Sequence, residues 1–115
     1  MKLNYNLIRD LLLLIEEEAD GFHPLSVSHY VNQIHGYSDN IIRYHIKFLQ
    51  DSRFIEYKNL GFIIDITPAG RKYLDNVRNP ELWNRAQKII QPFGKVGLDI
   101  VSAIGESLLL KEIGL

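Results

Sequence analysis

The sequence contains no cysteine, so it can form neither a disulfide framework nor a zinc site built on thiolates. It also has no excess of charge of either sign, because 13 lysines and arginines face 14 aspartates and glutamates. This balance excludes a protein whose whole surface attracts polyanions, but not one with a local basic face. Long apolar runs are missing too. The most apolar segment, residues 96–110, contains Asp99 and Glu106 and is shorter than a membrane span, so we predict no membrane helix.

What is present fits one ordinary folded domain. The chain has 115 residues, of which 46% are apolar and 23% charged, and this composition excludes a disordered tail. The apolar run Leu11–Ile15 follows Arg9 and Asp10 and precedes three glutamates, which are the wrong flanks for a signal peptide. We therefore expect a buried first helix in a cytoplasmic protein, with the glutamates forming a solvated helix end.

Cap residues and apolar spacing predict three helices in the first half of the chain. An asparagine at position 4 or 6 caps a helix that runs to about Ala19 and is apolar on more than one side. A second helix is expected over residues 28–34, ending at Gly36. Residues 25–27 either form a short strand or lead straight into that helix. Ser38 then caps a third helix that reaches about residue 51.

The third predicted helix has two contrasting faces when its residues are placed about 100° apart. The face expected to point inward carries Ile42, His45, Ile46 and Leu49. The face expected to stay in water carries Asn40, Arg43, Tyr44 and Lys47. The inward position of His45 indicates a core histidine with a bonded ring nitrogen. The four histidines of the chain share no ligand spacing with a carboxylate, so we expect no metal site.

The second half of the chain begins with a predicted hairpin. Two β-rich runs, residues 54–58 and 62–66, are joined by Asn59, Leu60 and Gly61, a length and composition typical of a bulged turn. Three further helices are expected to follow. The first spans residues 68–78, the second starts at Asn79-Pro80, and the third spans residues 98–113. The second of these helices has an apolar stripe made of Leu82, Trp83, Ala86, Ile89 and Ile90.

The order of these elements predicts a mainly α fold with a small β-hairpin wing, a winged helix-turn-helix, over residues 1–78. Residues 79–115 then form a helical extension. In a winged helix the third helix presents its solvent face to the major groove and the hairpin lies beside the DNA backbone. The residues expected to contact double-stranded DNA, through base edges or phosphates, are Ser38, Asn40, Arg43, Tyr44, Lys47, Arg53 and Lys58.

Two segments also resemble known regulators. Residues 38–55, SDNIIRYHIKFLQDSRFI, resemble the third helix of bacterial winged-helix regulators and the turn into their wing. Residues 66–70, ITPAG, are similar to the LT-x-x-G start of the helix after the wing in the same proteins. The chain departs from this pattern at Arg53, where those regulators have glycine. This predicts either a non-glycine residue in the left-handed conformation or a different bend.

Four motifs are spread over nearly the whole chain: Asn6-Leu7-Ile8-Arg9, Gly36-Tyr37-Ser38, Tyr44-His45-Ile46, and Leu74-Asp75 with Arg78 and Trp83. With these motifs the chain resembles a family of short phage- and prophage-borne bacterial proteins of unknown function. The resemblance implies a winged-helix fold and association with DNA, without an assigned activity.

We therefore expect a small DNA-binding protein, a phage-type transcriptional regulator, with a protein-interaction module that does not bind DNA as the alternative. No serine lies in a nucleophile elbow, and the glycines do not form a phosphate loop, so we predict neither an enzyme nor a cofactor. The two C-terminal helices either cover the rest of the chain, form a homodimer interface or bind another protein.

Overall fold

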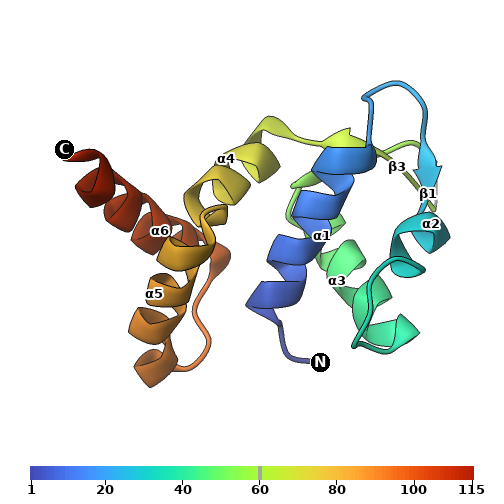
Figure 1. Cartoon of the computed structure of the whole chain (residues 1–115). Helices are drawn as coiled ribbons and strands as arrows, with labels where there is room; N and C mark the ends of the chain where they lie inside the picture. Colours follow the sequence, from blue (N-terminus) through green and yellow to red (C-terminus); the bar gives the residue numbers. More distant parts are fainter. Residues whose placement is uncertain (60) are drawn as a thin grey trace. The chain divides into compact units, whose positions relative to one another are not determined.

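The computed structural model describes residues 1–59 and 61–115, and Leu60 of the predicted hairpin turn lies outside the described residues. The described chain forms two compact units, Met1–Arg71 and Lys72–Leu115, which divide inside the fourth helix. The elements, drawn in Figure 1, are α1 (Tyr5–Glu18), β1 (Leu25–Ser26), α2 (Val27–Val31), α3 (Asp39–Asp51), β2 (Ile55–Tyr57), β3 (Phe62–Ile66), α4 (Pro68–Val77), α5 (Pro80–Ile90), the 3-10 turn η1 (Gln91–Phe93) and α6 (Leu98–Ile113).

The fold is mainly helical, with a small antiparallel sheet in the first unit. Its strands are ordered β1-β3-β2, so β3 lies in the middle. Both options left open for residues 25–27 occur together, because β1 is followed directly by α2. The ladder between β2 and β3 shifts register between Glu56 and Tyr57, as at a β-bulge, whereas the predicted bulged turn includes Leu60 and lies outside the described residues.

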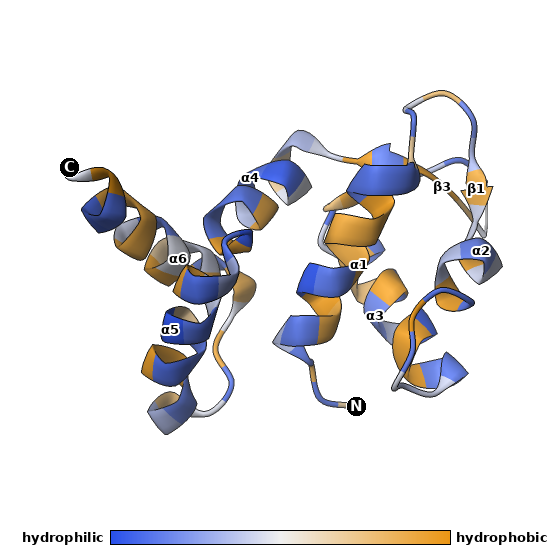
Figure 2. Cartoon of the chain, viewed as in Figure 1, coloured by the Kyte–Doolittle hydropathy of each residue, from blue (hydrophilic) through white to orange (hydrophobic). Residues whose placement is uncertain are grey.

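Helix α1 is the centre of the first unit's core. Asn4 caps it by accepting a hydrogen bond from the Leu7 amide. Helix α1 packs against α2, α3 and β3, in agreement with a helix that is apolar on more than one side. The apolar positions of α1 are visible as orange segments in Figure 2. Its fully buried residues are Leu7, Ile8, Leu11, Leu12 and Ile15.

The sequence predicted that the acidic end of α1 is simply solvated, but two of its glutamates have partners. Glu16 accepts a hydrogen bond from the Arg71 guanidinium at 2.6 Å. Glu18 lies 3.3 Å from His29 and accepts a 2.6 Å hydrogen bond from Gln33. Two of the three glutamates therefore connect α1 to α4 and to the α2 region, which offsets their unfavourable position at the end of a helix dipole.

Helix α2 is shorter than predicted. It ends at Val31 instead of Ile34, because beyond the C-cap Asn32 the amides of Gln33 and Ile34 bond to carbonyls three residues back rather than four. Gly36 follows with a φ of 92°, a conformation that favours glycine, and so redirects the chain into α3.

The turn between α3 and β2 takes the first of the two predicted forms. Arg53 has a φ of 60° and therefore occupies the left-handed conformation that favours glycine. We expect Arg53→Gly to raise the free energy of unfolding by up to about 1 kcal/mol. Glycine removes the strain of the left-handed conformation, and this gain is partly cancelled because glycine also gives the unfolded chain more conformational freedom. Urea denaturation followed by circular dichroism measures this. Asn59, at a φ of 61°, is the matched control, and Asn59→Gly should gain less because asparagine tolerates this conformation.

The second unit is built by the end of α4 together with α5 and α6. Asn79 caps α5, as predicted, and buried residues of α5 include Leu82, Trp83 and Ala86. Ile89 was predicted to belong to the same stripe but is 44% exposed. Ile89 is exposed because it lies at one edge of the apolar stripe. Among the described residues, no helix has both the length and the apolar character needed to cross a membrane.

Candidate nucleic-acid interface

Helix α3 carries the candidate site on its solvent side. Ile42, His45, Ile46 and Leu49 are buried, which confirms the inward face that the spacing predicted. The opposite side, here called the α3 outer face, is exposed, and even its bulky aromatic residue Tyr44 is 37% exposed. The α3 outer face consists of Asn40, Arg43, Tyr44 and Lys47.

His45 fixes the inner side of this helix. It is fully buried, and both of its ring nitrogens are bonded, as expected of a core histidine. Nδ1 donates to the Ile41 carbonyl at 2.7 Å, and Nε2 accepts from the Asn4 amide at 2.9 Å. The neutral imidazole with its proton on Nδ1 satisfies both bonds. His45 therefore joins α3 to the start of α1 and holds the α3 outer face towards water.

The start of α3 is fixed by a cap and by packing on α2. The Ser38 hydroxyl accepts a hydrogen bond from the Ile41 amide, so the predicted cap is confirmed. Ser38 itself is exposed at the edge of the α3 outer face. Because α2 and α3 pack together across the glycine-containing turn, the orientation of the outer face is set by the core of the first unit.

Arg43 is held by two partners. Its Nε donates to the Asp39 carboxylate at 2.8 Å, four residues earlier on the helix. Its Nη2 donates to the Ser28 hydroxyl of α2 at 3.0 Å. These bonds orient the guanidinium across the junction of the two helices, and the Asp39 carboxylate balances its charge.

Lys47 is paired in the same way. Its ammonium donates to the Asp51 carboxylate at 2.8 Å. This hydrogen bond, together with the charge of Asp51, raises the pKa of Lys47. Both side chains lie in water, where a pair of this spacing contributes only about 0.3 to 0.5 kcal/mol, so the ammonium can exchange partners easily. Tyr44, Lys47, Phe48 and Asp51 together line a small pocket of about 110 Å³.

The hairpin provides the remaining predicted residues. Arg53 and Lys58 are both exposed, at the two ends of β2, and so is Glu56 between them. A set of hydrogen bonds fixes the start of this strand against α4. The Thr67 hydroxyl donates to the Arg53 carbonyl at 2.6 Å and accepts from the Gly70 amide at 3.1 Å. The similarity of residues 66–70 to the LT-x-x-G motif therefore has a structural cause.

The surface formed by the α3 outer face and the hairpin is polar and carries charges of both signs. These exposed charges lie on α3 and β2 or next to them. The cations are Arg43, Lys47, Arg53 and Lys58, and the carboxylates are those of Asp39, Asp51 and Glu56. Asp51 and Ser28 were not among the residues predicted from the sequence to form this site. The four-residue spacing of Asp39 to Arg43 and of Lys47 to Asp51 nevertheless signals such ion pairs. Within residues 1–59 and 61–115, no group of three or more histidine and acidic side chains could hold a metal ion.

Comparison with known proteins identifies the family of the chain but not its activity. An uncharacterized protein of Haemophilus influenzae (strain ATCC 51907 / DSM 11121 / KW20 / Rd) is 27% identical over 117 residues, which cover 95% of this chain and 96% of that protein. No solved structure matches the chain. A family model described as "Hypothetical protein (DUF2513)" matches residues 2–96, which include all of the first unit beyond Met1 and all of the candidate interface. The chain therefore belongs to the DUF2513 family of hypothetical proteins.

Proposed function

We propose that this protein is a winged helix-turn-helix that binds duplex DNA, with the α3 outer face in the major groove and the β2–β3 hairpin beside the phosphate backbone. The element order from α1 to β3 and the strand order β1-β3-β2 support this fold. The observation that carries the function is the α3 outer face itself. It is an exposed polar strip on a helix whose other side is buried in the core.

The side chains of the α3 outer face suit base edges in the major groove. Asparagine can bond bidentately to adenine and arginine to guanine, while lysine reaches guanine or a phosphate. Arg53 and Lys58 on the hairpin suit phosphates, which position the protein without reading sequence. The resemblance to phage-borne proteins extends this proposal to a transcriptional regulator acting in the bacterial cytoplasm.

The carboxylates beside Arg43 and Lys47 have a direct consequence for this proposal. Asp39 and Asp51 would both lie near the DNA phosphates and repel them. Asp39 also pairs with Arg43, and Asp51 with Lys47, so each carboxylate competes with the DNA for a cation. We therefore expect Asp39→Asn/Asp51→Asn to tighten binding of duplex DNA about tenfold at low salt, as repulsion is removed and both cations are released. Fluorescence anisotropy with labelled duplexes measures the change.

The matched control removes two carboxylates from the second unit. Glu81→Gln/Glu112→Gln changes the net charge by the same amount but leaves α3 untouched, and its affinity for DNA should stay near that of the wild type. If both variants tighten binding equally, the effect is one of overall charge and the proposed face is wrong. If neither the wild type nor Asp39→Asn/Asp51→Asn binds duplex DNA at low salt, the proposed function is wrong.

One observation favours a second function, a module that binds another protein. Each cation of the α3 outer face is already matched by a carboxylate, so the face carries little net charge. Alternating charge of this kind suits a protein surface, where it provides specificity. For a protein partner, Asp39→Asn/Asp51→Asn would weaken binding instead of strengthening it, so the same variant separates the two functions.

A further inference from the structure

Helix α6 has a second apolar side that the chain leaves in water. One side buries Leu98, Val101 and Leu108. The opposite side, here called the α6 outer face, is exposed, with Ile100 at 46% and Leu110 at 40%. A helix that is apolar on nearly all sides normally has neighbours on all sides. The α6 outer face consists of Ile100, Ala103, Ser107 and Leu110.

The spacing of the α6 outer face is that of a coiled-coil seam. Its members are three, four and three residues apart, so they follow one line along the helix. The small side chains of Ala103 and Ser107 in the middle let a second helix come close. Ile100 and Leu110 stand at either end of these small residues and can each meet an apolar side chain of a partner.

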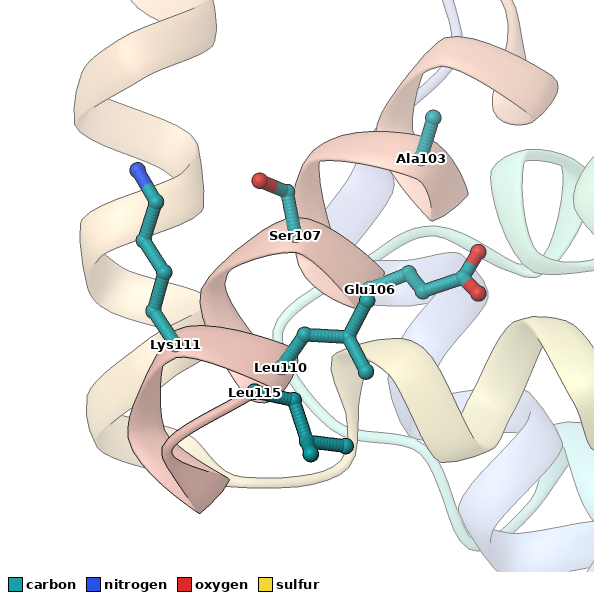
Figure 3. Close-up of a pocket in the computed structure, with 6 residues that line it drawn as sticks. All are labelled: Ala103, Glu106, Ser107, Leu110, Lys111 and Leu115. Atoms are coloured by element: carbon teal, nitrogen blue, oxygen red, sulfur yellow. The ribbon is translucent and has the colours of Figure 1, made fainter.

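A pocket of about 320 Å³ lies on the same face (Figure 3). Ala103, Glu106, Ser107 and Leu110 line it, and their spacing of i, i+3, i+4 and i+7 is that of the four residues that form a hole for a knob of a facing helix. The remaining lining residues are Lys111 and Leu115.

A backbone turn completes this pocket. Gly114 adopts a φ of 92°, its amide bonds to the Lys111 carbonyl at 3.1 Å, and the Leu115 amide bonds to the Leu110 carbonyl at 2.9 Å. This pair of bonds is a Schellman motif, which commonly brings the residue after the glycine against the one five positions earlier. The motif places Leu115 beside Leu110 as a wall of the pocket.

Two charged residues, Glu106 and Lys111, lie at the edges of this pocket. Glu106 and Lys111 extend to opposite sides of the helix (Figure 3). Within the part of the chain that the structure describes, neither forms an ion pair. In a parallel pair of identical helices, Glu106 of one copy faces Lys111 of the other, five positions on, on both sides of the seam. An antiparallel pair instead brings Glu106 near Glu106 of the second copy.

We infer that α6 forms a parallel homodimer through the α6 outer face. Leu110 of each copy packs into the end of the other copy's pocket that is lined by Ser107, Leu110, Lys111 and Leu115. Two ion pairs between Glu106 and Lys111 flank the seam and select the parallel direction. This interface lies wholly within the second unit, so it does not depend on the proposed DNA binding. A dimer also presents two α3 outer faces, as expected for a reader of two-fold DNA sites.

Sedimentation equilibrium of the full chain, without DNA, tests this inference. The wild type should show an average mass that rises with concentration from 13.3 kDa towards twice that value. Leu110→Glu should raise the dimer dissociation constant about tenfold or more, because it puts a charge into the pocket of the other copy. Ile89→Glu, the same kind of change at an exposed position of α5, should leave the constant near its wild-type value. Circular dichroism confirms that each variant is folded.

Charge exchange tests the direction of the helices without altering the apolar seam. Glu106→Lys and Lys111→Glu should each weaken the dimer, and the double variant Glu106→Lys/Lys111→Glu should restore it, because the pairs re-form with reversed sign. A wild type that stays at 13.3 kDa at every concentration overturns the inference. A Leu110→Glu variant that still dimerises like the wild type overturns the surface, and a double variant that is not restored overturns the parallel arrangement.

Discussion

Gly70→Ala should lower the free energy of unfolding of the first unit by about 3 kcal/mol, a large loss for the addition of one methyl group. A Cβ atom at position 70 would overlap the carbonyl oxygen of Phe54, and it would also lie 3.0 and 3.1 Å from the Phe54 carbonyl carbon and Cα. All three atoms belong to the backbone, so no side chain can rotate away. Either α4 or the turn after α3 must move.

The movement would break bonds that position the hairpin. The Thr67 amide donates to the same Phe54 carbonyl at 2.9 Å, and the Thr67 hydroxyl bonds to Arg53. Displacing this junction therefore disturbs β2 as well as α4. We expect a shift in the urea midpoint followed by far-ultraviolet circular dichroism, without a change in the denaturant slope.

The neighbouring position provides the control for Gly70→Ala. Ala69 is exposed, and Ala69→Gly should cost only the usual difference in helix propensity, about 1 kcal/mol. By the same propensity rule alone, Gly70→Ala would stabilise the helix. A Gly70→Ala protein as stable as the wild type, or more stable, contradicts the close approach of α4 to Phe54.

Arg43→Ala/Lys47→Ala should weaken the binding of duplex DNA about 100-fold at low salt. Each residue is expected to contribute a contact to a base or a phosphate, and the loss of such a contact typically costs about 1 to 3 kcal/mol. The change leaves the core intact, because both side chains point into water and their ion pairs are of the weak exposed type. Anisotropy titrations with one fixed duplex measure the ratio of affinities.

The control variant removes the same two residue types from the second unit. Arg85→Ala/Lys88→Ala takes one arginine and one lysine from exposed positions of α5. The net charge changes equally, so any general effect of charge on DNA binding appears in both variants. An equal loss of affinity in the two variants would contradict the assignment of the α3 outer face.

Much of the first unit could be predicted because its signals are local. The inner face of α3 follows from the spacing of Ile42, Ile46 and Leu49. Ser38 identifies the start of the helix because its hydroxyl can cap it. At Arg53 the sequence indicated either a left-handed conformation or a different bend, and the structure has the first of these. Each of these predictions depends on residues within one or two helical turns of one another.

The features that the sequence did not predict are long-range. The pairing of β1 with β3 joins Leu25 to Ile63, and nothing in a two-residue strand specifies a partner so far along the chain. The contact of Glu16 with Arg71 and that of Arg43 with Ser28 likewise depend on how the helices pack. The exposure of Ile89 arises because helical periodicity locates a stripe but not its edges.

If Arg43 and Lys47 contact nucleic acid, binding of duplex DNA must depend on salt through these two residues, and this dependence is the most direct test. The slope of log affinity against log salt should be clearly negative for the wild type and should become shallower by up to about 2 for Arg43→Ala/Lys47→Ala, because each phosphate contact contributes about 0.9. A wild-type slope near zero, or the same slope in the variant and the wild type, contradicts the proposed contact.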